Sequence, residues 1–187
     1  MMKKEPFVCS WRAGPVLTAA PRKLLHNPGR ILAPHISKGM TVMDIGCGMG
    51  FFTIPMSGIA GENGKIIAVD LQQQMLDGLL INAAKTGMKN ITAHRCAPDS
   101  LGVKSWNGSV DFALVFWMLH EVPDQERLIR ELYDTLSKNG KLLFAEPYVH
   151  VSGRAFQNSL NMIIKCGFTA AYAPKIAMSR AALLCKL

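Results

Sequence analysis

A regular alternation of strand-like and helix-like segments begins near residue 27 and continues to the end of the chain. Short apolar runs alternate with segments whose apolar residues recur at helical spacing. The expected strands are 41–45, 65–70, 91–95, 110–116 and 141–145, followed by two short strand-like runs within 168–187. Strands that alternate with helices in this way require a parallel sheet that helices cover on both faces.

The last two expected strands follow one another without a helix, so they form a hairpin and add an antiparallel member to the sheet. The expected fold class is therefore α/β, with a doubly wound, mostly parallel seven-stranded sheet that ends in a C-terminal antiparallel hairpin. Residues 27–187 form this domain. Residues 1–26, which include Cys9 and Trp11, do not follow the alternation. We expect them to form an N-terminal arm that acts as a lid over the carboxyl edge of the sheet; the alternatives are an arm that packs on the back of the sheet or one that mediates a dimer.

Three expected helix starts can be read from the sequence. Asn27-Pro28 is one helix start, Asp124 can N-cap a second helix, and Ser152 begins a third. The helix after Asp124 is expected to stop at Asn139-Gly140. Its apolar stripe consists of Leu128, Ile129, Leu132 and Leu136.

The composition, with 49% apolar and 18% charged residues, is that of a globular domain. The five cysteines lack a C-x-x-C motif, which disfavours a disulfide framework or a structural zinc site and favours a reducing cytoplasm.

The longest apolar run, Phe112–Leu119, is shorter than the about 20 residues that cross a bilayer. Arg12 and Pro15 interrupt the segment after the basic start, so we expect no secretory signal.

Glycines at alternate positions follow the first expected strand, in the segment Asp44-Ile45-Gly46-Cys47-Gly48-Met49-Gly50. The second strand ends in Asp70, whose carboxylate can accept both hydroxyls of a ribose. A dinucleotide fingerprint, G-x-G-x-x-G, would need a third glycine at position 51, where Phe51 would crowd the helix–strand packing. The spacing found, D-x-G-x-G-x-G, is instead the signature of class I S-adenosylmethionine-dependent methyltransferases.

Four segments resemble the motifs of that superfamily and occur in its order: Val42–Phe51, Ala68–Leu71, Val110–Val122 and Gly140–Pro147. The resemblance covers roughly residues 27–187 and is to the "methyltransferase domain" type that acts on small molecules, which also includes quinone-biosynthesis methyltransferases. It implies a Rossmann-like methyltransferase fold and in-line methyl transfer to a small-molecule acceptor. The implied cofactor is S-adenosylmethionine, which leaves as S-adenosylhomocysteine.

The resemblance also implies which residues hold the cofactor. Asp44 and the glycine backbone would face its methionine part, Asp70 the ribose, and Phe116 the reactive methyl. The family usually places an aspartate after the third strand, where this chain has Cys96, so the contact to the adenine amino group is left open. The complete implied set is Asp44, Gly46, Cys47, Gly48, Gly50, Asp70, Leu71, Met75, Cys96, Ala97 and Phe116.

No motif identifies a catalytic residue, because the enzyme mainly has to hold acceptor, methyl and sulfur in line. A weakly acidic acceptor would need a base, and His120 is the first candidate because its ordinary pKa is near neutral. Glu146, Tyr148 and His150 are weaker candidates. His120, Glu121 and Asp124 lack the spacing of a metal site, so we expect no metal.

Two other functions remain open at this point. The net charge of +8 is compatible with a tRNA or rRNA methyltransferase, although the N/D-P-P-Y/F/W run of enzymes that methylate base amines is missing after the fourth strand. The glycine loop and Asp70 are also compatible with a non-catalytic subunit that binds the cofactor for a partner. The chain could act as a monomer or as a homodimer.

Overall fold

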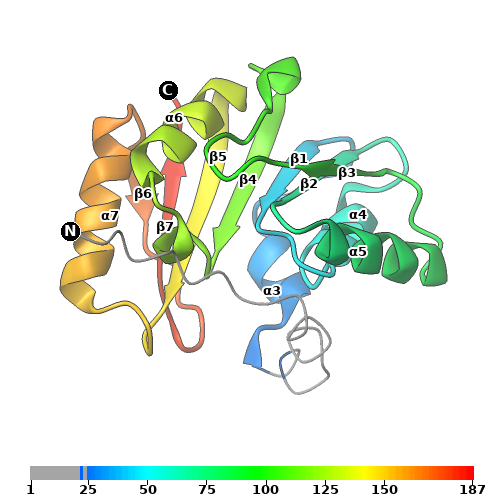
Figure 1. Cartoon of the computed structure of the whole chain (residues 1–187), viewed down its shortest axis with the longest axis horizontal. Coiled ribbons are helices and arrows are strands. Elements are labelled where there is room, and N and C mark those ends of the chain that lie inside the picture. Colours follow the sequence, from blue (N-terminus) through cyan, green and yellow to red (C-terminus); the bar gives the residue numbers. More distant parts are fainter. Residues whose placement is uncertain (1–21, 23–24) are drawn as a thin grey trace.

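A seven-stranded sheet forms the centre of the molecule (Figure 1). The computed structural model describes Arg22 and residues 25–187, so the expected N-terminal arm with Cys9 and Trp11 lies almost entirely outside the described residues. The strands are β1 (Thr41–Ile45), β2 (Lys65–Asp70), β3 (Ile91–Arg95), β4 (Val110–Phe116), β5 (Leu136–Pro147), β6 (Thr169–Tyr172) and β7 (Ser179–Cys185).

The strand order is β3-β2-β1-β4-β5-β7-β6. Neighbours from β3 to β5 are parallel, and β7 is antiparallel to both β5 and β6. The expected mostly parallel sheet with a C-terminal antiparallel hairpin is thereby confirmed. The chain reverses its direction of winding between β1 and β4, and ligands of doubly wound sheets bind beyond the strand ends at such a switch point.

The helices are α3 (Pro28–Leu32), α4 (Thr53–Ala60), α5 (Gln73–Lys85), α6 (Gln125–Thr135) and α7 (Gly153–Lys165), with 3-10 turns η2 (Lys104–Trp106) and η3 (Leu119–Glu121). The predicted N-cap Asp124 and the predicted helix starts at Asn27 and Ser152 are confirmed. The side chains of Asn27, Asp124 and Ser152 each accept a hydrogen bond from a backbone N–H three residues later. Each cap satisfies one of the N–H groups that a helix start leaves without a partner.

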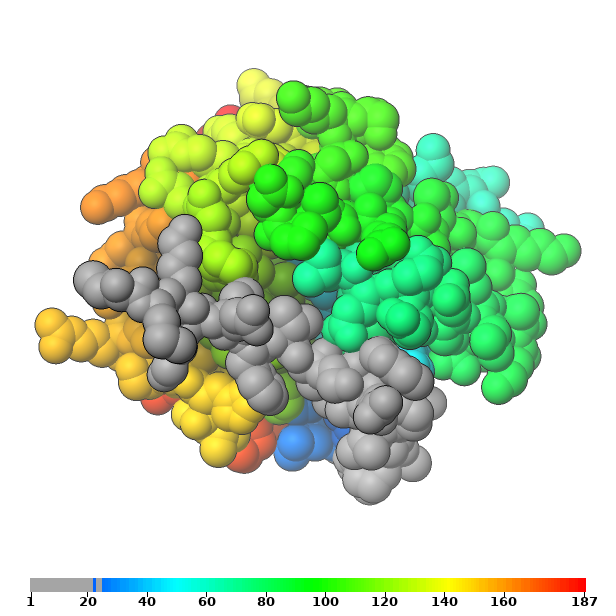
Figure 2. Space-filling view, in the orientation of Figure 1, coloured from blue at the N-terminus to red at the C-terminus, as the bar shows by residue number. Residues whose placement is uncertain are grey.

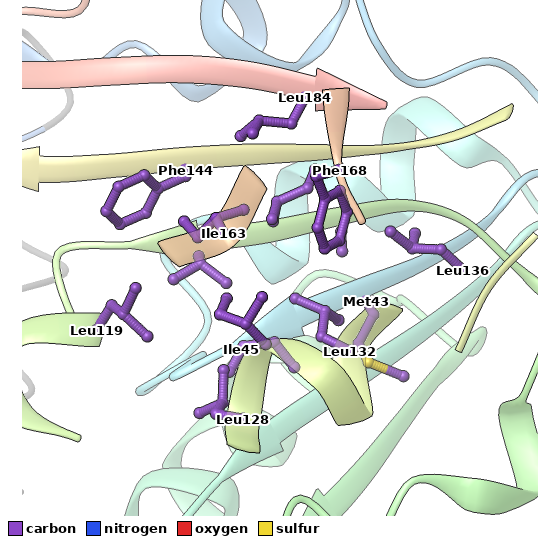
Figure 3. Close-up of a cluster of buried hydrophobic side chains, with 14 of the residues drawn as sticks. Met43, Ile45, Leu119, Leu128, Leu132, Leu136, Phe144, Ile163, Phe168 and Leu184 are labelled. Carbon is purple, nitrogen blue, oxygen red and sulfur yellow. The ribbon is translucent and has the colours of Figure 1, made fainter. Parts of the chain in front are cut away.

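Successive residues of each central strand face opposite layers, which divides the core in two. Met43 of β1 packs with α6 and α7, whereas the adjacent Val42 packs with α3 and α4. Helix α5 lies on the side of α3 and α4, where Leu79 packs on Ala68 of β2. Figure 3 shows the first layer, in which side chains of β1, β5 and β7 meet those of α6 and α7. Burial of each such side chain contributes about 1.5–3 kcal/mol.

One predicted helix end is wrong: α6 stops at Thr135 instead of Asn139-Gly140, and Leu136 is already the first residue of β5. The last carbonyls of α6 have partners outside the helix, since Ser109 N donates to Thr135 O (3.0 Å) and Lys186 Nζ donates to Tyr133 O (2.8 Å). Leu136 is fully buried as a strand residue. Its apolar character therefore fits the helical stripe and the strand equally well.

Helices α6 and α7 lie on the left of the molecule and α5 on the right, in the orientation of Figures 1 and 2. None of the helices within the described part of the chain combines the length and the apolar character needed to span a bilayer.

Candidate functional site

A cavity of about 410 Å³ opens at the carboxyl ends of the parallel strands. Its wall is built from residues at or directly after the carboxyl ends of β1 to β5, such as Gly46, Asp70, Cys96, Trp117 and Pro147. Eleven of the twelve residues predicted for the site line it: Asp44, Gly46, Cys47, Gly48, Asp70, Leu71, Met75, Cys96, Ala97, Phe116 and His120. The sequence pattern and the geometry therefore single out the same end of the sheet.

Gly50 is the predicted site residue that does not line the cavity. Its φ of +93° is in the left-handed region, and a Cβ there would come within 2.4 Å of Leu79 Cδ1. Gly50 thus allows the loop after β1 to pack closely on α5, which is a structural role.

The glycine loop is fixed by backbone hydrogen bonds to β2. The N–H groups of Gly46 and Cys47 donate to Val69 O at 2.8 and 3.1 Å. Gly46 also has a positive φ of +72°, and a Cβ there would come within 2.9 Å of Met118 Cγ. The loop after β1 and the loop after β4 consequently approach each other so closely that only glycine fits.

Asp70 ends β2 with both carboxylate oxygens oriented by the backbone. Its Oδ2 accepts from Gly48 N at 2.9 Å, and its Oδ1 accepts from Gln72 N at 2.9 Å. Burial raises the pKa of Asp70, although these N–H donors favour the charged form. Each oxygen retains a lone pair for a hydroxyl of a ligand.

Asp44 is a buried carboxyl group at the floor of the cavity. Its Oδ2 accepts a hydrogen bond of 2.6 Å from the Thr53 hydroxyl at the start of α4. Burial raises the pKa of Asp44 to about 7, and the Asp70 carboxyl adds to this shift. A carboxyl group with a strongly perturbed pKa in a cavity is a candidate for a functional role.

His120 lies on the loop after β4 and is held by Glu146, which lies near the end of β5. His120 N donates to Glu146 Oε1 at 3.0 Å, and the ring Nδ1 lies 2.7 Å from Oε2. The hydrogen bond to Glu146 raises the pKa of His120 more than its partial burial lowers it. Because Nδ1 is engaged, Nε2 is the ring nitrogen left for a ligand.

The two weaker base candidates beyond β5 differ in position. His150 lines the cavity, and its ring centroid lies 5.8 Å from that of His120. Tyr148 does not line the cavity and is half exposed. Glu146 is buried behind His120, so the structure makes it a partner of that residue.

Four aromatic side chains form one wall of the cavity: Phe51, Phe52, Phe116 and Trp117. Successive ring centroids lie 4.9, 4.5 and 5.5 Å apart. Trp117 has a φ of +60°, which costs on the order of 1–3 kcal/mol in a residue other than glycine. Its N donates to Ala145 O and its Nε1 to Ser179 Oγ, both at 2.8 Å, and these bonds hold the indole against the cavity.

The loop after β3 is tied to α6 by Glu131, a lining residue that the sequence did not indicate. Its Oε2 accepts from Ser100 Oγ at 3.0 Å and from Leu101 N at 2.8 Å. The spacing of Arg127 and Glu131 predicts only an ordinary pair on one helix face, which is also present at 3.3 Å. The link to Ser100 depends on tertiary packing.

The charge of the cavity is opposite to that of the chain. Among the described lining residues, six carry carboxyl groups: Asp44, Asp70, Asp99, Glu121, Asp124 and Glu131. The lining arginines are Arg22 and Arg127. A cavity of this kind favours a cationic ligand and disfavours a phosphate. Within the described residues, no group of three or more His, Cys, Asp or Glu side chains is arranged to hold a metal ion.

A family profile described as "Methyltransferase domain" matches residues 36–177. The chain is 25% identical over 122 residues to a demethylmenaquinone methyltransferase of Lactococcus lactis, an alignment that covers 64% of this chain and 48% of that protein. It is 26% identical over 123 residues to an arsenite methyltransferase of Aquipseudomonas alcaligenes, which covers 63% and 36%. The chain thus spans about half or less of the length of these two relatives.

The fold is also similar to that of a solved structure, a SAM dependent methyltransferase from Aquifex aeolicus. The TM-score is 0.87 at 19% sequence identity, and the match covers 96% of this chain and 100% of that one. A solved structure therefore shares the fold of this chain over nearly its whole length.

Proposed function

Because the chain belongs to the methyltransferase domain family of S-adenosylmethionine-dependent methyltransferases, we propose that it transfers a methyl group from S-adenosylmethionine to a small-molecule acceptor. The observation that carries this proposal is the orientation of Asp70 by Gly48 N and Gln72 N, beside the glycine loop in one cavity. Two hydroxyls on neighbouring carbons, as in a ribose, fit a carboxylate held in this way.

The other predicted residues complete the cofactor site in this proposal. The backbone of Gly46, Cys47 and Gly48 borders the methionine part, together with Asp44. Leu71 and Met75 border one side of the adenine, and Cys96 and Ala97 another. Phe116 stands at the end of β4, next to the reactive methyl. All of these residues line the same cavity, which supports a single continuous binding site.

Bound S-adenosylmethionine supplies an electrophilic methyl carbon on a sulfonium, which a nucleophile displaces in line. The carboxyl groups of the cavity attract this cation, and the aromatic wall excludes water from the point of transfer. Trp117, Met118 and Val122 offer an apolar surface for the acceptor beside His120. The protein's main contribution is the alignment of acceptor and methyl.

His120 is proposed to remove a proton from a weakly acidic acceptor. Glu146 accepts the Nδ1 proton, so neutral His120 exposes the lone pair of Nε2 as a base. The proton taken up by Nε2 gives an imidazolium that the adjacent Glu146 carboxylate stabilises. The acceptor atom then forms its bond to the methyl carbon while the carbon–sulfur bond breaks, and the electron pair stays on sulfur.

The relatives named above as demethylmenaquinone and arsenite methyltransferases support a small acceptor. The acidic cavity also supports this choice over RNA, whose phosphates would meet the carboxyl groups of the lining.

The test is release of S-adenosylhomocysteine across a panel of uncharged phenols, thiols and quinols, with an RNA duplex and a hairpin as the alternative arm. We expect acceptor-dependent release with at least one small molecule and none with RNA. Release with RNA alone would overturn the small-molecule proposal. Tight cofactor binding without release in any arm would favour the non-catalytic subunit.

A further inference from the structure

Arg22 lies at the wall of the cavity where the loops after β1 and β4 meet. Its guanidinium carbon is 4.4 Å from the ring centroid of Phe51 and 5.5 Å from that of Trp117. Phe51 directly follows the glycine loop, and Trp117 directly follows β4. Arg22 precedes α3, the first helix of the sheet domain, and its side chain reaches the switch point between β1 and β4.

The two arginines of the cavity lie at different places and have different surroundings. Arg127 on α6 pairs with Glu131, which in turn holds the loop after β3. Arg22 stacks on aromatic rings, and its charge acts on the buried Asp44, whose pKa it lowers against the larger effect of burial. Arg22 is therefore the cation beside the glycine loop and Asp44.

The methionine part of the proposed cofactor carries the cofactor's one anionic group, the α-carboxylate. In a cavity lined by six carboxyl groups, that carboxylate needs a cation to offset repulsion. A guanidinium stacked on an aromatic ring presents a planar fork of N–H donors at its edge, which matches a carboxylate. From its place beside the glycine loop, we propose that Arg22 binds the α-carboxylate of the methionine part. This inference rests on the proposed function.

The experiment compares two ligands that differ in this carboxylate alone. Calorimetric titration of the full chain uses S-adenosylmethionine and its decarboxylated form, which retains the adenosine, the sulfonium and the amine. The variants are Arg22→Gln, Arg22→Lys and, as a matched control from the same cavity, Arg127→Gln. Thermal unfolding without ligand establishes that each variant is folded.

In the wild-type protein we expect S-adenosylmethionine to bind at least about tenfold more tightly than the decarboxylated form, the scale of a charged hydrogen bond. Arg22→Gln should remove this preference by weakening the first ligand and leaving the second unchanged. Arg22→Lys keeps the positive charge but lacks the planar pair of N–H donors, so it should retain part of the preference for S-adenosylmethionine. Arg127→Gln should change both affinities by the same factor.

Equal affinities of the two ligands for the wild-type protein would overturn the inference. So would an Arg22→Gln variant that keeps the wild-type preference or weakens both ligands equally. If Arg22→Gln does not fold, an Arg22→Lys variant with the full wild-type preference would overturn it. Failure of the wild-type protein to bind either ligand would instead overturn the proposed function itself.

Discussion

Glu146 accepts hydrogen bonds from two donors of the same residue, the backbone N and the ring Nδ1 of His120, at 3.0 and 2.7 Å. The pairing links the loop after β4 to β5 and fixes both the position and the tautomer of the imidazole. It also places a buried carboxylate where it stabilises a protonated imidazole.

We predict that Glu146→Gln lowers kcat/KM by at least about 10²-fold, the lower end of a general base's contribution. A glutamine amide can donate to Nδ1, which favours the neutral tautomer with its proton on Nε2 and leaves only a minor population in which Nε2 is free to act as the base. The control is His150→Asn, in the same cavity, for which we expect a loss of less than about tenfold. Wild-type rates for Glu146→Gln would contradict the assigned role of the pair.

The pH dependence of kcat/KM gives a second test of the pair. Glu146 raises the pKa of His120 above its ordinary value of 6.5, so the acidic limb of the profile should lie above pH 6.5 in the wild-type enzyme. Removal of the carboxylate removes that stabilisation of the imidazolium. The limb in Glu146→Gln should therefore shift to lower pH, and an unchanged limb would assign it to another group.

The buried Asp44 carboxyl group should lower the free energy of unfolding of the protein when no ligand is bound. Its pKa is about 7 in the folded chain and near 3.8 when exposed, so the folded state holds the proton more tightly and loses stability as the pH rises from about 4 to 7. We predict that Asp44→Asn has a higher Tm than the wild type at pH 8, by at least about 2 °C, and that the difference shrinks at pH 5. The same variant should bind the cofactor less tightly. A lower Tm at pH 8 would contradict this prediction.

Asp70→Ala should weaken S-adenosylmethionine binding by about 1.5–3 kcal/mol, the scale of a hydrogen bond to a charged group. Asp77→Ala, on the nearby helix α5, is the matched control, because Asp77 is exposed and outside the cavity. Its affinity should equal that of the wild type. If the Asp70→Ala variant bound S-adenosylmethionine as tightly as the wild type does, the carboxylate at the end of β2 would not contact the ribose.

The N-terminal arm remains a proposal, since all but a few of its residues lie outside the described part of the chain. Arg22, the described residue of the arm nearest in sequence to residues 1–21, lines the same cavity as Trp117 and His120. Deletion of residues 1–20 should keep cofactor affinity within about 1 kcal/mol and abolish turnover, because a lid excludes water during transfer. Full turnover by the truncated protein would rule out the lid.

The local features of the fold were predictable from the sequence because they depend on nearby residues. Strand 110–116 is apolar at every position except Asp111, and Asn27, Asp124 and Ser152 cap their helices through contacts only three residues away. The end of α6 was not predictable. It depends on Ser109 and Lys186, which are distant in sequence from Thr135.

The gathering of the residues proposed to hold the cofactor in one cavity was predictable for a different reason: they come from strand ends that the fold brings together. The residues proposed to contact the acceptor were less predictable. Glu146 was considered as a base in its own right, and its pairing with His120 spans 26 residues that no spacing rule connects. Arg22 belongs to the segment outside the alternation, and its stacking on Phe51 arises only in the folded chain.

The central claim is tested most directly by calorimetric titration of the full chain with S-adenosylmethionine, S-adenosylhomocysteine and NAD. The account predicts binding of the first two, with a matching rise in Tm, and no binding of NAD. Phe51 stands where the third glycine of a dinucleotide site would lie, and the acidic cavity disfavours a pyrophosphate. Binding of NAD without binding of S-adenosylmethionine would contradict the account.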